Sequence, residues 1–177
     1  MAIARYCARL ANLEGEGADW ATSQMMMEES NDISNLYVAA KYRGEAPDTH
    51  ANWEKVMKEE LPKHLAMLEV KITESGFFGS KMCAGDVAIA SVINMGLDND
   101  LDLAPFPKLQ AMYAAICLGE GPCASYIASA PGPYFKRPTP PPVLFYWGMK
   151  ARAHVHVMLL TAGKVDFKWE QDPGDYK

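Results

Sequence analysis

Apolar residues recur every three to four positions over the first 130 residues, which is the spacing of one face of a helix. One stretch, DVAIASVINM, is apolar nearly all round, as is typical of a helix buried at the centre of a domain. The pattern therefore predicts an all-helical unit. Its helices are expected over 2–13, 18–43, 49–74, 86–95, 106–118 and 121–129.

Two of the predicted helices have features that bear on packing. In the helix over 49–74, Pro62 lacks an N–H donor and crowds the preceding turn, so we expect a kink or a split there. The helix over 18–43 has several apolar stripes that we expect to be buried. They comprise Trp20, Met25, Met27, Ile33, Leu36, Tyr37 and Ala40.

The pattern changes after residue 130. The stretch over 131–142 holds six of the twelve prolines and reads as an extended linker. Beyond it, a short apolar run at 143–146 predicts a buried strand, 151–160 is helix-like, and 165–169 alternates as a second strand does. A strand, a helix and a strand at this spacing predict a right-handed crossover between parallel strands.

Composition and net charge narrow the range of possible functions. The chain has 177 residues and a net charge of -5, which argues against nucleic-acid binding because phosphates favour a basic face. None of the four cysteines forms a CxxC pair, and His154 and His156 lie two positions apart on a predicted helix, where they cannot chelate together. We therefore predict free thiols, with a single disulfide as the alternative, and no metal.

The N-terminus and the apolar runs bear on location. No run approaches the roughly 18 residues of a membrane span, and arginines interrupt the apolar N-terminus where a signal peptide would be continuous. These features predict a cytoplasmic protein. The alternative is an organelle protein whose targeting peptide was removed before residue 1.

Four segments together resemble the cytosolic glutathione transferase superfamily, in particular its mu, pi and sigma classes. AIARY resembles the helix after the family's Gln-Ser glutathione motif, and PVLFYWGMKARAHVHVMLL is similar to its first strand and helix. The central loop and buried helix are the most specific match. The segments lie at 2–6, 62–94, 107–113 and 142–160.

The resemblance implies a mainly α fold, with a partial thioredoxin-like β-α-β unit after the helical bundle. Residues 1–13 would be the last helix of a thioredoxin-like domain, 14–130 the helical C-terminal domain, 131–142 a linker, and 143–177 the start of a second thioredoxin-like domain. This order is the reverse of the family's. We expect a window of a tandem array, with a circularly permuted unit as the alternative.

The residues themselves also indicate how the central helix begins. Asp86 lies where a capping-box acid would bond back to the N-cap backbone. The N-cap position holds Cys83 where the family has Ser or Thr, so we expect a weaker helix start.

Site residues follow from the resemblance as well. Tyr146 would hydrogen-bond the glutathione sulfur and favour its thiolate, with a core aromatic as the alternative reading. Glu28 would reach a partner subunit's glutathione amine, or be an ordinary solvent-facing acid. Met25 and Met26 would line the electrophile pocket, or belong to the core or a dimer interface. The remaining glutathione ligands would be Trp147, Arg152, Tyr176 and Lys177.

Two functions remain open at this point. The first is conjugation of glutathione, as substrate, to a hydrophobic electrophile, with the half-site completed by further sequence or another chain. The second is a non-catalytic structural or adaptor subunit, because fold alone does not imply activity. The resemblance implies a homodimer or a larger assembly in either case.

Overall fold

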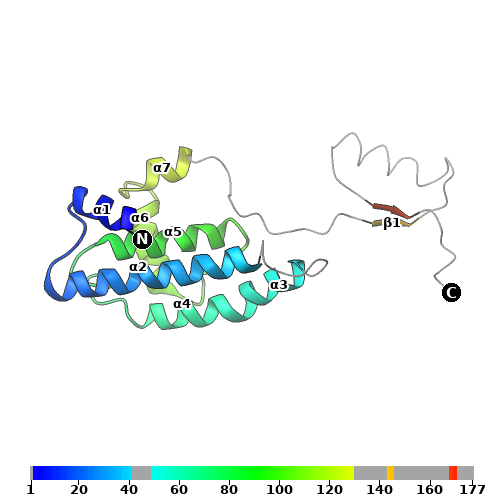
Figure 1. The fold of residues 1–177 in the computed structure, drawn as a ribbon, viewed down its shortest axis with the longest axis horizontal. Coiled ribbons are helices and arrows are strands. Elements are labelled where there is room, and N and C mark those ends of the chain that lie inside the picture. The colour runs from blue at the N-terminus through cyan, green and yellow to red at the C-terminus, as the bar shows by residue number, and fades with distance from the viewer. Residues whose placement is uncertain (1, 41–48, 130–142, 146–167, 171–177) are drawn as a thin grey trace. The chain divides into compact units, whose positions relative to one another are not determined.

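The computed structural model describes residues 2–40, 49–129, 143–145 and 168–170, and the chain divides into two units, 1–138 and 139–177. The described part of the first unit is helical, and α2 and α5 run side by side across it (Figure 1). Its helices are α1 (Ala2–Leu10), α2 (Gly17–Val38), α3 (Thr49–Lys55), the π-helical turn η2 (Val56–Glu60), α4 (Leu61–Glu69), α5 (Ala84–Leu97), α6 (Pro107–Cys117) and α7 (Ala124–Ser129).

The first helix is shorter than the pattern predicts. α1 ends at Leu10, because Asn12 takes a left-handed φ of 57° that an α-helix cannot continue through. Gly15 then takes a φ of 78°, which a residue without a Cβ adopts at little cost. The chain can therefore turn between α1 and α2 within a few residues.

The predicted break at Pro62 is confirmed. The run from Thr49 to Glu69 is interrupted by η2, where the Leu61 N–H donates to the Val56 carbonyl instead of the usual carbonyl four residues back. Pro62 follows in the first turn of α4, where its missing N–H costs little. Pro62 therefore divides the predicted helix into shorter helical segments that follow one another without a loop between them.

The predicted central position of α5 is confirmed by its burial. Its most extensive packing is against α2, and Gly85 makes that approach possible. A Cβ added to Gly85 would lie 2.7 Å from the Ser23 carbonyl oxygen and 2.8 Å from the Met26 Cβ, closer than real contacts allow. The two backbones therefore meet where glycine removes the side chain.

A single apolar core joins α2 to α6. Tyr37 and Trp53 are among its largest fully buried members, with ring centroids 5.8 Å apart. The prediction that Trp20 and Met25 are buried is wrong, since they are 50% and 57% exposed. The apolar residues of α2 lie on more than one side, and only one side can face the core. The members from α2 are Met26, Ile33 and Tyr37.

The start of α6 is held by α4. At its start, the Glu69 carboxylate at the end of α4 accepts the N–H groups of Lys108 and Leu109, both at 2.9 Å. An acid at this position satisfies N–H groups that have no partner within the helix and complements its dipole.

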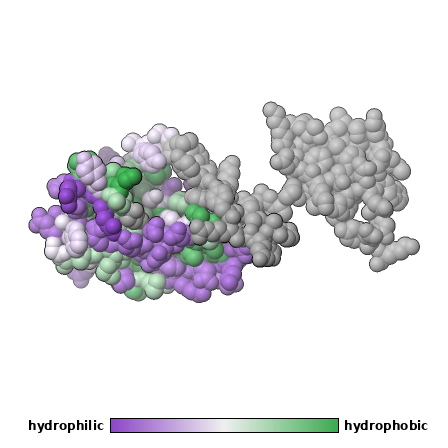
Figure 2. All heavy atoms as spheres, in the orientation of Figure 1, coloured by the Kyte–Doolittle hydropathy of each residue, from purple (hydrophilic) through white to green (hydrophobic). Residues whose placement is uncertain are grey.

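The face shown in Figure 2 mixes hydrophilic and hydrophobic residues over the helical unit.

The described part of the second unit is a pair of parallel strands, β1 (Val143–Phe145) and β2 (Lys168–Glu170). Val143 lies opposite Lys168, and Phe145 lies opposite Glu170. These strands overlap the two predicted at 143–146 and 165–169. The predicted linker at 131–142 and helix at 151–160 lie outside the described residues.

Candidate functional site

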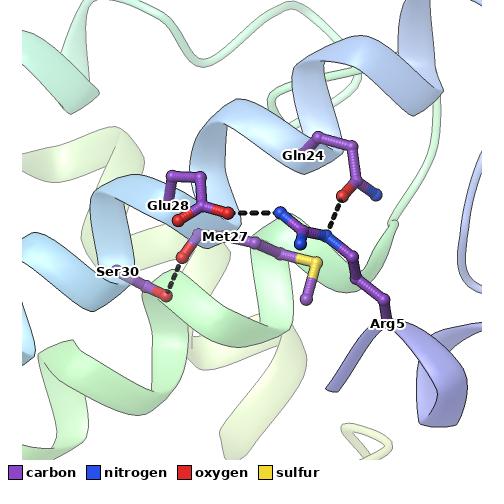
Figure 3. Close-up of polar contacts among 5 residues, drawn as sticks. All are labelled: Arg5, Gln24, Met27, Glu28 and Ser30. Carbon is purple, nitrogen blue, oxygen red and sulfur yellow. Dashed lines mark hydrogen bonds and ion pairs between the residues drawn. The ribbon is translucent and has the colours of Figure 1, made fainter. Parts of the chain in front are cut away.

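Arg5 joins α1 to one face of α2, as Figure 3 shows. Its Nε donates to Gln24 Oε1 at 2.6 Å, and its terminal nitrogen forms an ion pair with the Glu28 carboxylate. Gln24 and Glu28 are four residues apart and therefore share a helix face. Both charged side chains are about half exposed, so the pair adds little stability. It links α1 to α2 in the structure.

Glu28, the acid predicted to reach across a dimer, therefore has a partner within its own chain. The carboxylate remains at the surface of α2 beside the Arg5 guanidinium. The role across a dimer stays a prediction. Sequence reasoning missed Arg5 and Gln24, although the four-residue spacing of Gln24 and Glu28 marks a shared polar face.

The three consecutive methionines of α2 diverge. Met25 is exposed, Met26 belongs to the buried core, and Met27 is buried beneath α1. Successive helical residues point about 100° apart, so neighbours cannot line one wall. The structure does not bring Met25 and Met26 together, and their role in an electrophile pocket stays a prediction.

Met27 instead lines a cavity of about 300 Å³ that we name the alanine cavity. Small side chains of α1 and α5 form most of its wall, with the exposed thiol of Cys7 at one side. The small residues leave room between α1, α2 and α5. The lining residues are Ala4, Cys7, Ala8, Ala11, Leu13, Met27, Ala84, Val87, Ala88 and Ser91.

The outer face of α1 is apolar and uncovered within the described part of the chain. Ile3, Tyr6 and Leu10 are 81%, 63% and 70% exposed. Their spacing of three and four residues places them on one stripe, which we name the α1 stripe. Only Ala8 of this helix is buried.

The start of α5 is a satisfied structural site. Asp86 Oδ2 accepts the Cys83 N–H at 2.7 Å, and Asp86 Oδ1 accepts the Phe78 N–H at 2.9 Å. Burial raises the pKa of Asp86, although both N–H groups favour its carboxylate form. Asp86 therefore ties the preceding loop to the first turn of α5.

Ser23 of α2 compensates for the thiol at the N-cap. Its Oγ accepts the Gly85 N–H at 3.0 Å, a bond that an N-cap serine or threonine would ordinarily supply from within the helix. Burial raises the pKa of the Cys83 thiol, which suits a packed group. Sequence reasoning missed Ser23, because nothing local marks a cap that comes from another helix.

Apart from Glu28, the residues predicted to bind glutathione fall outside the described residues. Tyr146 and Trp147 follow β1 directly, and Arg152, Tyr176 and Lys177 lie further along. Within the described ranges, no group of three His, Cys, Asp or Glu residues could hold a metal ion. Of the helices described, none is long and apolar enough to cross a membrane.

Comparison with known proteins matches the helical unit to one family. Residues 31–128, more than half of the chain, match the family described as "Glutathione S-transferase, C-terminal domain". The chain therefore belongs to this family, as its loop and buried helix predict. No curated protein matches the sequence.

A solved structure supports the assignment. The Pi-class glutathione S-transferase of Onchocerca volvulus is 27% identical, with a TM-score of 0.52. The match covers 63% of this chain and 55% of that chain. This chain thus spans about half the length of the transferase that it matches.

Proposed function

We propose that this chain is the helical half of a glutathione transferase, and that a glutathione-binding half is completed by further sequence or by another chain. Family membership supports the first part. The α1 stripe is the single observation that supports the second. An apolar face on an ordered helix favours a partner surface.

A sheet is the partner that this stripe fits. α1 is fixed to the helical unit by Arg5 and by the buried Ala8, so its outer face is presented in one orientation. The pair β1 and β2 is too small to be stable alone, because a two-stranded sheet needs a packed face. A thioredoxin-like sheet laid on the α1 stripe would cover this apolar surface.

The chemistry follows from the residue after β1. The Tyr146 hydroxyl donates to the glutathione sulfur and stabilises the thiolate, whose proton leaves to solvent. The thiolate then attacks an electrophilic carbon, forming a C–S bond as a leaving group departs. Trp147, Arg152, Tyr176 and Lys177 hold the tripeptide, and Glu28 meets its amine across a dimer. Met25, the exposed member of the methionine pair, faces the electrophile. The free cysteines suit a reducing compartment, and we place the activity in the cytoplasm.

Isothermal titration of glutathione into the full chain tests this proposal. We expect saturable binding that is lost on removal of residues 131–177. In Tyr146→Phe, the pKa of bound glutathione, followed by thiolate absorbance, should rise relative to the wild-type complex. Absence of binding at millimolar glutathione would rule out completion of the glutathione-binding half by a second copy of this chain.

A second function, an adaptor that assembles larger complexes, is favoured by the same α1 stripe. Sedimentation velocity of the chain and of the double variant Ile3→Ser with Leu10→Ser separates the two. Assembly lost in the variant, with no glutathione binding in either protein, would establish the adaptor. Glutathione binding in the wild type would favour the transferase.

A further inference from the structure

The chain turns back sharply between α6 and α7, which lie in contact (Figure 1). Leu118 ends α6 in an extended conformation, and Gly119 then takes a left-handed φ of 57°. Gly121 lies so close to the last turn of α6 that an added Cβ would be 2.6 Å from the Ile116 carbonyl oxygen. The segment over 118–123 is therefore folded against the end of α6.

This turn brings two cysteines together. The Cys123 N–H donates to the Ile116 carbonyl oxygen at 2.9 Å, and Ile116 directly precedes Cys117 in the chain. By standard peptide dimensions, this bond limits the distance between the Cα atoms of Cys117 and Cys123 to at most about 7 Å. The Cα atoms of disulfide-bonded cysteines are usually about 4.4–6.8 Å apart. The backbone therefore needs little or no movement to join the two side chains.

The side chains of the pair also lie near each other. Cys117 belongs to the buried core, and the partly buried Cys123 side chain packs against that core. Burial and the neighbouring Cys123 thiol together raise the pKa of Cys117 to about 11. The Cys123 thiol acts through space, and such an effect falls with distance, which places the two thiol groups close together. Both are free thiols in the structure.

We propose that Cys117 and Cys123 form a reversible disulfide by exchange with a small disulfide oxidant of the glutathione disulfide type. Cys123 is the more exposed thiol, so its thiolate attacks one sulfur of the oxidant, forms a mixed disulfide and releases one thiolate. Cys117 then loses its proton and attacks the Cys123 sulfur, which forms the internal disulfide and releases the second thiolate. The two released thiolates take up the two protons that the cysteines lose. Two protein thiols are thereby oxidised, and one small disulfide is reduced to two thiols.

The bond would act on α7. None of the residues of this helix is buried, and its Ile127 packs only partly buried against the core. A bond from Cys123, directly before α7, to the end of α6 would hold the start of the helix in place and slow its local opening. In a reducing compartment such a disulfide is transient and responds to the redox state. This response requires none of the residues assigned above to glutathione conjugation.

Equilibration of the full chain with mixtures of reduced and oxidised glutathione tests the proposal. After acid quenching and alkylation of free thiols, peptide mass spectrometry should find Cys117 and Cys123 joined in a peptide that lacks two hydrogen atoms. The equilibrium constant for this bond should be at least about tenfold larger in the folded chain than in urea, because the fold holds the two thiols together. An equal constant in urea, or a wild-type Cys123 that retains glutathione, would overturn the proposal.

A second oxidant separates this result from binding at a glutathione site. Hydroxyethyl disulfide contains no glutathione, and it should oxidise the same pair of cysteines. Formation of the internal bond with glutathione disulfide alone would mean that a bound tripeptide, rather than the geometry of the turn, directs the exchange.

Three variants establish the order of the steps. In Cys117→Ala, Cys123 should remain as the mixed disulfide with glutathione, because the second thiol is missing. In Cys123→Ala, Cys117 should stay reduced, since its side chain is buried. Cys7→Ala removes a thiol outside the pair and should leave the internal disulfide unchanged. Loss of the internal disulfide in Cys7→Ala, or a mixed disulfide on Cys117 in Cys123→Ala, would contradict the assignment.

Amide hydrogen exchange measures the effect on α7. Oxidation of the wild type should slow exchange in this helix at least about tenfold. Exchange in Cys123→Ala should be the same with and without oxidant. Unchanged exchange in the oxidised wild type would contradict the proposed effect on α7.

Discussion

α5 and α1 both belong to the helical unit, and both carry apolar residues. Those of α5 are mostly buried, whereas those of α1 are mostly exposed. α5 buries residues along its whole length, including Ile89, Ala90 and Ile93. α1 buries only Ala8 and exposes Ile3 and its two stripe neighbours. α5 is apolar nearly all round, whereas α1 carries Arg5 and Arg9 beside its apolar residues. The apolar faces of α5 are covered by other elements, and the apolar face of α1 is not covered within the described residues.

The polar contacts differ in the same way. At the start of α5, Asp86 and Ser23 satisfy buried N–H groups, so their loss leaves donors without water or partner. At α1, Arg5 and Glu28 form an exposed pair that water can replace. We therefore expect changes at α5 to act on folding and changes at the α1 stripe to act on association.

Thiol reactivity should show the largest contrast. Cys7 on α1 is exposed, while burial, with Cys123 nearby, raises the pKa of Cys117 to about 11. At pH 8 the Cys117 thiolate is about 0.1% of the total, and its fraction grows only as the pH approaches that value. Iodoacetamide should modify Cys7 at least about 100-fold faster, as measured by peptide mass spectrometry. Equal modification rates for Cys7 and Cys117 in the folded protein would contradict the burial of Cys117.

Asp86→Ala should have the largest effect on stability. It leaves the buried N–H groups of Phe78 and Cys83 without an acceptor, and we expect a loss of about 2–4 kcal/mol. Urea unfolding followed by circular dichroism measures it. Asp86→Asn keeps one acceptor oxygen and should lose less stability than Asp86→Ala. If both variants matched the wild type, the loop before α5 would not depend on this carboxylate.

Gly85→Ala tests the close approach of α5 to α2. The added methyl would overlap the Ser23 backbone, so we expect a loss of about 1–3 kcal/mol. Ser23→Ala removes the acceptor of the Gly85 N–H without adding volume and should cost less. The same unfolding experiment measures both. A neutral Gly85→Ala would mean that the two helices can separate freely.

The smallest effect on stability is expected at the α1 stripe. Ile3→Ser and Leu10→Ser exchange exposed groups, so the free energy of unfolding should change by less than about 0.5 kcal/mol. Ala8→Asp, at the one buried position of the same helix, is the matched control and should destabilise clearly. A large decrease in the free energy of unfolding in the stripe variants would show that these side chains already stabilise the helical unit.

The same division explains what the sequence could predict. The central helix and the break at Pro62 depend on local spacing and on proline chemistry, so both could be read from the chain. Trp20 and Met25 could not be placed, because α2 has apolar residues on several sides and only packing selects one. The bonds from Ser23 and Arg5 join different helices, and no local pattern marks them. Apart from Glu28, the residues predicted to bind glutathione lie outside the described ranges, so prediction and structure can be compared only over the helical unit.

The π-helical turn η2 has a consequence for how this chain can vary in length. Val56 and Leu61 are both buried, yet they are five residues apart, a step that would rotate a regular α-helix about 140° out of phase. A π turn brings residues five apart onto one side, so the segment behaves as an α-helix with one residue inserted. Homologues lacking one residue between Met57 and Glu60 could keep the same buried face. Such a deletion would also place the Pro62 ring inside a regular helix, so we expect it to accompany replacement of that proline.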